Sequence, residues 1–240
     1  SRGLGDVYKR QGLRTGNIYS PFPEEMNRKL TGSLATYHFA PTSSAEKNLM
    51  KENIGSAHLY VTGNTVIDAL QTTVKDNYQF EETLLNNLDY KGRRIVLITT
   101  HRRENLGEPM RHVYKAIRRL VEAFDDIEVV FPVHKNPKVR SIVKEELGDV
   151  ERVHLIDPLE YEPFANLMAR SYLLMTDSGG IQEEAPALGK PVLVLRNTTE
   201  RPEAVTAGTV RLVGTDENTV YDTAYRLLAD KEAFDVMANS

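Results

Sequence analysis

The sequence predicts an α/β fold in which a parallel sheet carries helices on both of its faces. From about residue 90 onward, short apolar runs rich in β-branched residues alternate with segments whose apolar residues recur at helical spacing. Polar loops that contain glycine or proline separate the two kinds of segment, and no long internal repeat is present. Alternating strands and helices are typical of βαβ units, whose parallel strands are buried on both faces.

The first strand and helix of this pattern are the clearest. Residues 94–99 form a continuous apolar run, which indicates a strand that is buried on both faces. In residues 109–124, Val113 and Ile117 are part of an apolar set that recurs every three or four positions, as on the buried face of a helix. Residues 127–131 then repeat the strand pattern.

Caps and helix breakers set the limits of the later elements. Asn136 before Pro137 is typical of an N-cap followed by proline at the first helical position, and Gly148 ends that helix. Pro186 lies inside a predicted helix and is expected to distort it. The remaining predicted strands cover residues 153–156, 172–176, 191–195 and 209–213, and the remaining helices cover 163–170, 181–188, 218–229 and 231–240.

The N-terminal quarter of the chain has a different organisation. Residues 1–11 lack any periodicity and are interpreted as a non-native scar of the kind that sequencing adapters leave, so they are excluded from the fold prediction. Residues 12–60 are interpreted as the remnant of a preceding domain, and residues 61–240 as the C-terminal domain. The elements predicted up to this boundary are helices at 21–34 and 43–53 and strands at 36–40 and 58–61, and a helix at 64–70 follows it.

Composition excludes several classes of function. The chain has 240 residues, of which 40% are apolar and 27% charged, with a formal charge of −4 and no long basic run, so a nucleic-acid partner is disfavoured. There is no cysteine, which excludes disulfides, thiolate metal sites and a cysteine nucleophile. Neither a signal-peptide pattern nor an apolar run long enough for a membrane span is present, and we predict a cytoplasmic protein without a membrane partner.

The segment from Thr176 to Glu184 is the strongest candidate for a binding site. An apolar strand leads into Thr176-Asp177-Ser178-Gly179-Gly180, and a helix follows. A glycine turn lets a ligand approach the backbone, the helix start offers N–H groups to a phosphate, and a carboxylate at Glu184 can accept hydrogen bonds from ribose hydroxyls. An ordinary capped helix start explains the same residues equally well. The pattern is neither a GxGxxG nor a Walker A loop, so a nicotinamide cofactor is not indicated.

Polar loops also follow other strands of the predicted sheet. His101 and Arg102 come directly after one strand, His134 after the next, and Arg201 after a third. In an open parallel sheet, ligands bind beyond the carboxyl ends of the strands, where these loops meet. Each loop alone could be a solvated turn, but their convergence on one edge favours a binding site for a phosphorylated ligand.

At these residues the chain resembles the bacterial non-hydrolysing UDP-N-acetylglucosamine 2-epimerases. The matching segments include GLRTGNIYSPFPEEMNRKL, THRREN, FPVHKNP and TDSGGIQEEAPALGKPVLVLRNTTERPEAVTAGTVRLVG. The resemblance implies a GT-B-like fold of two Rossmann-like domains with parallel sheets, of which the first is largely missing here. It also implies reversible conversion of UDP-GlcNAc to UDP-ManNAc by elimination and re-addition of UDP through 2-acetamidoglucal, without a cofactor or a metal.

The resemblance also implies roles for individual residues. His101 and Glu24 match the family's catalytic histidine and one of its cleft carboxylates. A second UDP-GlcNAc is expected to act as an allosteric activator beside the active site, where Arg102 and His134 match the family, and the full-length protein is expected to be a homodimer. The residues expected to bind the UDP-sugar substrate are Phe164 at the uracil, Ser178, Gly179 and Gly180 at the diphosphate, Glu184 at the ribose and Arg201 at a phosphate or the sugar.

One departure from the family pattern bears on activity. The family reads Glu-Ala before Gly-Leu-Arg-Thr, whereas this chain reads Arg10-Gln11, and a further catalytic aspartate of the family lies upstream of the sequence. This fragment is therefore expected to be inactive or nearly so, because removing one of several catalytic residues that act as a unit can eliminate most of the reaction rate. The alternatives are a GT-B-type glycosyltransferase, a hydrolysing epimerase, or a module that only binds UDP.

Overall fold

The computed structural model describes residues 12–19, 22–199 and 201–239. The chain divides into two compact units, one of Ser1–Ala69 with Thr198–Glu203 and one of Leu70–Asn197 with Ala204–Ser240. Residues 1–11, which are interpreted above as a non-native scar, lie outside the described residues. The domain boundary expected at residue 60 stays a prediction.

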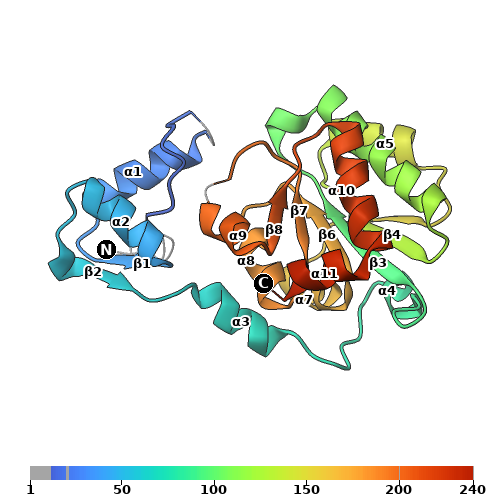
Figure 1. Ribbon diagram of the computed structural model, residues 1–240, viewed down its shortest axis with the longest axis horizontal. Coiled ribbons are helices and arrows are strands. Elements are labelled where there is room, and N and C mark those ends of the chain that lie inside the picture. Colours follow the sequence, from blue (N-terminus) through green and yellow to red (C-terminus); the bar gives the residue numbers. More distant parts are fainter. Residues whose placement is uncertain (1–11, 20–21, 200, 240) are drawn as a thin grey trace. The chain divides into compact units, whose positions relative to one another are not determined.

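The second unit is built on a six-stranded sheet in which each strand pairs in parallel with its neighbours (Figure 1). The strand order is β5-β4-β3-β6-β7-β8. This is the strand order of a doubly wound Rossmann sheet, and it confirms the predicted α/β class. The strands are β3 (Arg94–Thr99), β4 (Ile127–Pro132), β5 (Val153–Ile156), β6 (Leu173–Thr176), β7 (Val192–Val194) and β8 (Val210–Leu212).

Both faces of this sheet are buried, as the continuous apolar runs predict. Along β3, Val96 and Ile98 belong to one hydrophobic cluster, whereas Ile95 and Leu97 belong to another. Since successive strand residues point to opposite faces, the two clusters are the two faces of one sheet. The helices of this unit are α4 (Thr83–Asn87), α5 (Glu108–Ala123), α6 (Pro137–Leu147), α7 (Tyr161–Arg170), α8 (Ile181–Ala187), α10 (Glu217–Ala229) and α11 (Lys231–Ala238), with a 3₁₀ turn, η3 (Arg103–Asn105).

Helices cover the sheet on both sides. The first cluster contains buried residues of α5, α6 and α10, and α5 packs beside α10 (Figure 1). The second cluster contains residues of α7 and α8 together with Phe80, which precedes α4, and Leu85, which lies in α4. This arrangement leaves the two ends of the strands as the edges at which polar loops can gather.

Strands β3 and β6 are parallel neighbours, and successive strands are added to the sheet in opposite directions on either side of this pair. The register pairs Val96 with Leu173 and Thr99 with Thr176, so the two strands end together. From β3 the chain continues outward to β4, and from β6 it continues in the opposite direction to β7. Such a switch point opens a crevice at the carboxyl ends of the two strands, because the loops that follow them turn to opposite faces of the sheet.

The first unit contains a two-stranded parallel sheet of β1 (His38–Ala40) and β2 (Leu59–Val61). Its small core consists of Ala40, Ala45, Leu49 and Leu59. The predicted elements of this part are present, and several are shorter than expected. The helices are α1 (Glu24–Leu34), α2 (Ser43–Lys51) and α3 (Thr65–Thr73), which crosses the division between the units. The prediction lacks the 3₁₀ turn η2 (Ser56–His58) and also α9 (Pro202–Ala207), which crosses the division near residue 203.

The structure corrects several predicted boundaries. The helix expected at 163–170 begins at Tyr161, and that expected at 64–70 continues to Thr73. Helix α4 is absent from the prediction, because five residues are too few to display a helical period. As expected, Pro186 coincides with an early end: α8 has seven residues, and the N–H of Leu188 bonds to the carbonyl of Ala185 in a tightened last turn. In the described parts of the chain, no helix is long and apolar enough to cross a bilayer.

The start of α6 offers a test of the local sequence signals. The Asn136 side chain accepts a hydrogen bond of 3.0 Å from the N–H of Lys138, and Pro137 occupies the first helical position. We expect Asn136→Ala to lower the free energy of unfolding by about 1 kcal/mol, because a helix N–H loses its acceptor. Urea denaturation measures this loss. The control, Asn136→Asp, keeps an acceptor oxygen and is expected to retain most of the stability of the parent protein. Equal losses in the two variants would contradict the capping role of Asn136.

Candidate functional site

The loops at the switch point bring several predicted residues to one edge of the second unit. His101 and Arg102 follow β3, Ser178 follows β6, and His134 follows β4. The rings of His101 and His134 lie nearly parallel, with their centroids 6.5 Å apart. The two loops therefore converge as the sequence predicts, and they place two imidazoles and a guanidinium at the same end of neighbouring strands.

Asp177 organises this edge, although the sequence analysis assigned it no role. Its carboxylate is fully buried and lies 2.8 Å from Nδ1 of His101. The same carboxylate accepts hydrogen bonds of 2.9 Å from the backbone N–H groups of His101 and of Arg102. Asp177 thus joins the loop after β3 to the loop after β6 through three contacts.

These contacts also decide the charge of the carboxylate. Burial by itself would raise the pKa of Asp177, but the hydrogen bond from the His101 ring, its charge and the two backbone N–H groups outweigh burial. The pKa of Asp177 consequently lies below its ordinary value, and the group is an anion at neutral pH. An anion in contact with Nδ1 holds the His101 ring in one orientation.

Hydroxyl groups brace the same two strand ends. The Thr99 and Thr176 side-chain oxygens lie 2.6 Å apart, and Thr176 also accepts a hydrogen bond from the N–H of Ser178. One residue further along, the Thr100 hydroxyl lies 2.7 Å from the hydroxyl of Tyr114, and both groups are buried. Burial raises the pKa of Tyr114, so its phenol stays neutral and can act as a donor.

The segment Ser178-Gly179-Gly180 leads from β6 into α8. Gly180 is the N-cap of α8 and, as a glycine, has no side chain with which to cap the helix. Glu184 lies one turn later and is only 8% exposed, and a Cβ on Gly180 would lie 3.5 Å from its Oε1. The loop and the carboxylate predicted to bind diphosphate and ribose are therefore neighbours.

The charges at this edge suit an anionic ligand. His101, Arg102 and His134 lie at this edge, and the exposed Glu104 of the same loop lies 3.9 Å from Arg196. The buried carboxylate of Asp177 is occupied by the contacts described above. The cationic and donor groups at this edge are able to interact with a negatively charged ligand.

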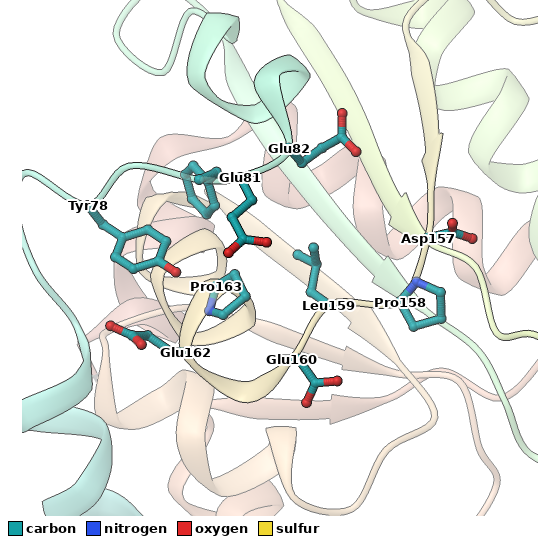
Figure 2. Close-up of a pocket in the computed structure, with 10 residues that line it drawn as sticks. Tyr78, Glu81, Glu82, Asp157, Pro158, Leu159, Glu160, Glu162 and Pro163 are labelled. Atoms are coloured by element: carbon teal, nitrogen blue, oxygen red, sulfur yellow. The ribbon is translucent and has the colours of Figure 1, made fainter.

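A second concavity at the carboxyl end of β5 has the opposite character. It has a volume of about 480 Å³ and lies between the segment before α4 and the start of α7. Figure 2 shows carboxylates surrounding the apolar side chains of Leu159 and Pro163. The acidic residues are Glu81, Glu82, Asp157, Glu160 and Glu162. Glu162 and Asp157 pair with Lys75 and Arg140, but the remaining three carboxylates still disfavour the phosphates of a nucleotide in this pocket.

Phe164 lies close to this pocket in the chain but is not one of its lining residues. It is half-buried on α7 and packs against the second hydrophobic cluster, and its N–H bonds to the carbonyl of Glu160. The structure therefore holds its ring on a rigid helix, next to the loop that follows β5. Within the described residues, no group of three or more His, Asp and Glu side chains is arranged to hold a metal ion.

Glu24 and Arg201 belong to the first unit. Glu24 is the first residue of α1 and is half-buried, and Arg201 is buried, with its N–H 3.1 Å from the Thr199 hydroxyl. The neighbouring Glu25 is fully buried, and its Oε1 accepts hydrogen bonds from the N–H groups of Thr15 and Gly16. Glu25 thus holds the preceding loop against the start of α1, a role that the sequence analysis missed.

Comparison with known proteins identifies the family. The family model described as UDP-N-acetylglucosamine 2-epimerase matches residues 10–240. The UDP-N-acetylglucosamine 2-epimerase of Bacillus subtilis is 56% identical over 230 residues, which cover 95% of this chain and 59% of the relative. The chain thus spans about three fifths of the length of the relatives it matches.

Solved structures of similar proteins share the fold. The UDP-GlcNAc 2-epimerase of Neisseria meningitidis, in a crystal structure bound to UDP-GlcNAc, matches with a TM-score of 0.90 and 47% identity over 95% of this chain and 62% of its own. S. aureus MnaA, in a structure with UDP, matches with a TM-score of 0.90 and 48% identity over 95% of this chain and 62% of its own. These matches bear out the predicted GT-B-like fold class, and the chain belongs to the UDP-N-acetylglucosamine 2-epimerase family.

Proposed function

We propose that the full-length protein interconverts UDP-N-acetylglucosamine and UDP-N-acetylmannosamine without releasing the sugar by hydrolysis. The observation that carries this proposal is the placement of His101, Arg102 and the Ser178-Gly179-Gly180 loop at one switch point, in a chain that belongs to the epimerase family. Similar proteins in complex with UDP-GlcNAc and with UDP support the same ligand.

The proposed reaction has two steps. In the first, a base removes the proton from C2 of the sugar while the bond between C1 and the diphosphate oxygen breaks, which releases UDP and 2-acetamidoglucal. In the second, the diphosphate oxygen adds back to C1, and C2 receives a proton on its opposite face. Neither step transfers a hydride, so the proposed reaction has no need of a nicotinamide. Stabilisation of the departing diphosphate is therefore the main electrostatic task of the site.

The residues at the carboxyl edge are suited to this task. We assign His101 to the diphosphate, together with the backbone of Gly179 and Gly180, and Glu184 to the ribose hydroxyls. Glu24 is assigned as a cleft carboxylate that serves the chemistry at C2, and Arg201 as a contact to the phosphate or the sugar. We assign Phe164 to the uracil, where a half-buried aromatic ring can stack on a base.

We also infer an activator site beside the substrate site. Arg102 and His134 are the residues assigned to it, and the 6.5 Å between the rings of His134 and His101 supports two adjoining sites. A second UDP-GlcNAc is the proposed activator, and the full-length protein is proposed to be a cytoplasmic homodimer.

For the present chain, the sequence favours binding of UDP over turnover. Position 10 carries arginine where the family carries glutamate, and residue 10 lies outside the described residues. Removing one member of a catalytic group can eliminate most of the rate, whereas the diphosphate and ribose contacts proposed above are independent of that residue.

Glu184→Ala provides the first binding test. We expect calorimetric titration to show that the variant binds UDP about 1–3 kcal/mol more weakly, which is roughly 5- to 150-fold, because ribose hydroxyls lose their acceptor. Glu183→Ala is the matched control, since adjacent helical residues point in directions about 100° apart, and it is expected to bind UDP normally. Equal losses in the two variants, or no loss in either, would remove Glu184 from the site.

Product analysis tests the reaction itself. The protein for this test carries the N-terminal half of a relative in place of residues 1–11, which also puts glutamate at position 10. Incubation with UDP-GlcNAc is expected to yield UDP-ManNAc. Formation of UDP with free ManNAc would indicate a hydrolysing epimerase instead. Release of UDP together with a new glycoside, only when an acceptor is added, would indicate a glycosyltransferase.

A further inference from the structure

We propose that Asp177 is the positioning residue for His101: it fixes the ring proton on Nδ1 and thereby leaves Nε2 as the atom that meets the diphosphate. This inference deepens the proposed function and rests on its assignment of His101 to the ligand. No role for Asp177 follows from the sequence pattern, because its partner lies 76 residues away in the chain.

The geometry around the His101 ring supports a fixed tautomer. Nδ1 lies 2.8 Å from Oδ1 of Asp177, and an ionised carboxylate can only accept hydrogen bonds. The ring must therefore place a proton on Nδ1, whether the imidazole is neutral or charged. In the neutral ring, Nε2 then has a lone pair, and in the charged ring Nε2 is a donor.

The backbone makes the position of the carboxylate independent of the ring. Asp177 also accepts the N–H groups of His101 and Arg102, and its own N–H donates to the carbonyl of Thr99 at 3.3 Å. Because the carboxylate is fully buried, no water competes for these bonds. The same residue thus sets both the path of the loop and the orientation of the side chain that the loop carries.

The other charged groups near the ring are not arranged to do the same. Arg102 directs its Nε toward the backbone carbonyl of Asp177 at 3.4 Å, and as a cation it cannot accept the Nδ1 proton. His134 faces His101 ring to ring, and its Nδ1 accepts the N–H of Asn136. Within this unit, Asp177 is therefore the anion that faces His101.

The arrangement has a chemical consequence for the proposed reaction. When UDP leaves, negative charge develops on the bridging diphosphate oxygen, and a donor at Nε2 stabilises it. The Asp177 carboxylate holds the ring through Nδ1, as the buried aspartate does in a Ser-His-Asp triad. In that system the asparagine substitution gives the wrong tautomer and lowers kcat by about 10⁴-fold, which sets the scale expected for Asp177→Asn in an active full-length enzyme.

The test is a ¹⁵N–¹H correlation spectrum of the histidine rings in this chain, with and without Asp177→Asn. It is recorded at about pH 9, where an ordinary imidazole is neutral. In the parent protein, the proton of His101 is expected on Nδ1. In the variant, the amide keeps its oxygen toward the backbone N–H groups and turns its NH₂ toward Nδ1, so the proton is expected to move to Nε2. His101→Gln assigns the signals.

Glu128→Gln is the matched control. Glu128 lies 2.6 Å from Nε2 of His154 on the neighbouring strands, so this variant removes an equivalent carboxylate from a different ring. It is expected to change the spectrum of His154 and to leave that of His101 unchanged. A merely structural role for Asp177 would not exchange the two nitrogens of the His101 ring.

Two outcomes would overturn the proposal. One is a parent spectrum in which the His101 proton resides on Nε2, and this result needs no variant, so it decides the matter even if Asp177→Asn does not fold. The other is a folded variant with an unchanged His101 tautomer. Addition of UDP separates the two proposals: UDP that binds without shifting the His101 Nε2 signal would contradict the diphosphate assignment, whereas the tautomer result tests Asp177 alone.

Discussion

Asp177→Ala is expected to lower the free energy of unfolding of the second unit by about 2–4 kcal/mol at neutral pH. The substitution strands the N–H groups of His101 and Arg102, which donate to the carboxylate at 2.9 Å. Each buried donor without an acceptor costs about 1–3 kcal/mol, which is partly offset because the buried charge is removed as well. The loss is a large share of the 5–15 kcal/mol that is typical of a domain.

The effect of Asp177 should also depend on pH in a defined direction. Burial opposes its ionisation, but the contacts from His101 and Arg102 hold the pKa of Asp177 below its ordinary value. A carboxylate whose pKa is depressed in the folded state contributes stability above its unfolded pKa of about 3.9, and loses that contribution as the pH falls through the folded pKa. The difference between the parent protein and Asp177→Ala should therefore be full at about pH 7 and 5 and should shrink below about pH 4.

Urea denaturation at about pH 7, 5 and 3 measures this dependence. Asp177→Asn serves as the control, because its amide oxygen still accepts backbone N–H groups, and it is expected to lose less stability than the alanine variant. A difference between Asp177→Ala and the parent that stays constant down to about pH 3 would show that the carboxylate is not a stabilising anion.

Phe131→Ala is expected to have the largest effect, a loss of about 3–5 kcal/mol in the free energy of unfolding. The ring is fully buried in β4, and its centroid lies 5.6 Å from that of Tyr114 on α5. Removing it leaves a cavity between the sheet and the helix that the surrounding residues cannot fill without moving. The same strand leads to His134, so the cavity lies beneath the candidate site.

Denaturation followed by both near- and far-ultraviolet circular dichroism measures this loss and shows whether one transition or two is affected. Phe131→Leu is the control, since it keeps most of the apolar volume, and it is expected to lose less than about 1.5 kcal/mol. If Phe131→Ala lowers the free energy of unfolding by less than about 1 kcal/mol, the hydrophobic cluster around Phe131 does not contribute substantially to the stability of the sheet.

Much of the second unit could be predicted because its signals are local. The continuous apolar run from Arg94 to Thr99 becomes β3 without a change of boundary, and Asn136-Pro137 becomes the start of α6. Burial on both faces of a strand and capping of a helix depend on neighbouring residues, so they can be read from a short window. Helix α4 was missed because its five residues offer no such window.

The candidate site could be predicted only in part. The polar loops at His101, His134 and Ser178 were expected at one edge, since parallel strands end on the same side of a sheet. The role of Asp177 was not expected, because a single aspartate inside a polar turn has the same appearance whether it faces solvent or a buried ring. Glu25 was missed for the same reason: two adjacent acidic residues at a helix start suit the helix dipole equally well.

The sequence by itself therefore determined the α/β class, most helix and strand positions of the second unit, and the family, all of which depend on short patterns and on residue identity. Only the tertiary structure decided that β3 pairs with β6, so that Thr99 and Thr176, which are 77 residues apart, lie within hydrogen-bonding distance. It also decided that the carboxylate of Asp177 contacts Nδ1 of His101. Strand pairing depends on the packing of the whole sheet, and a carboxylate acquires its partners and its depressed pKa only when that packing excludes water.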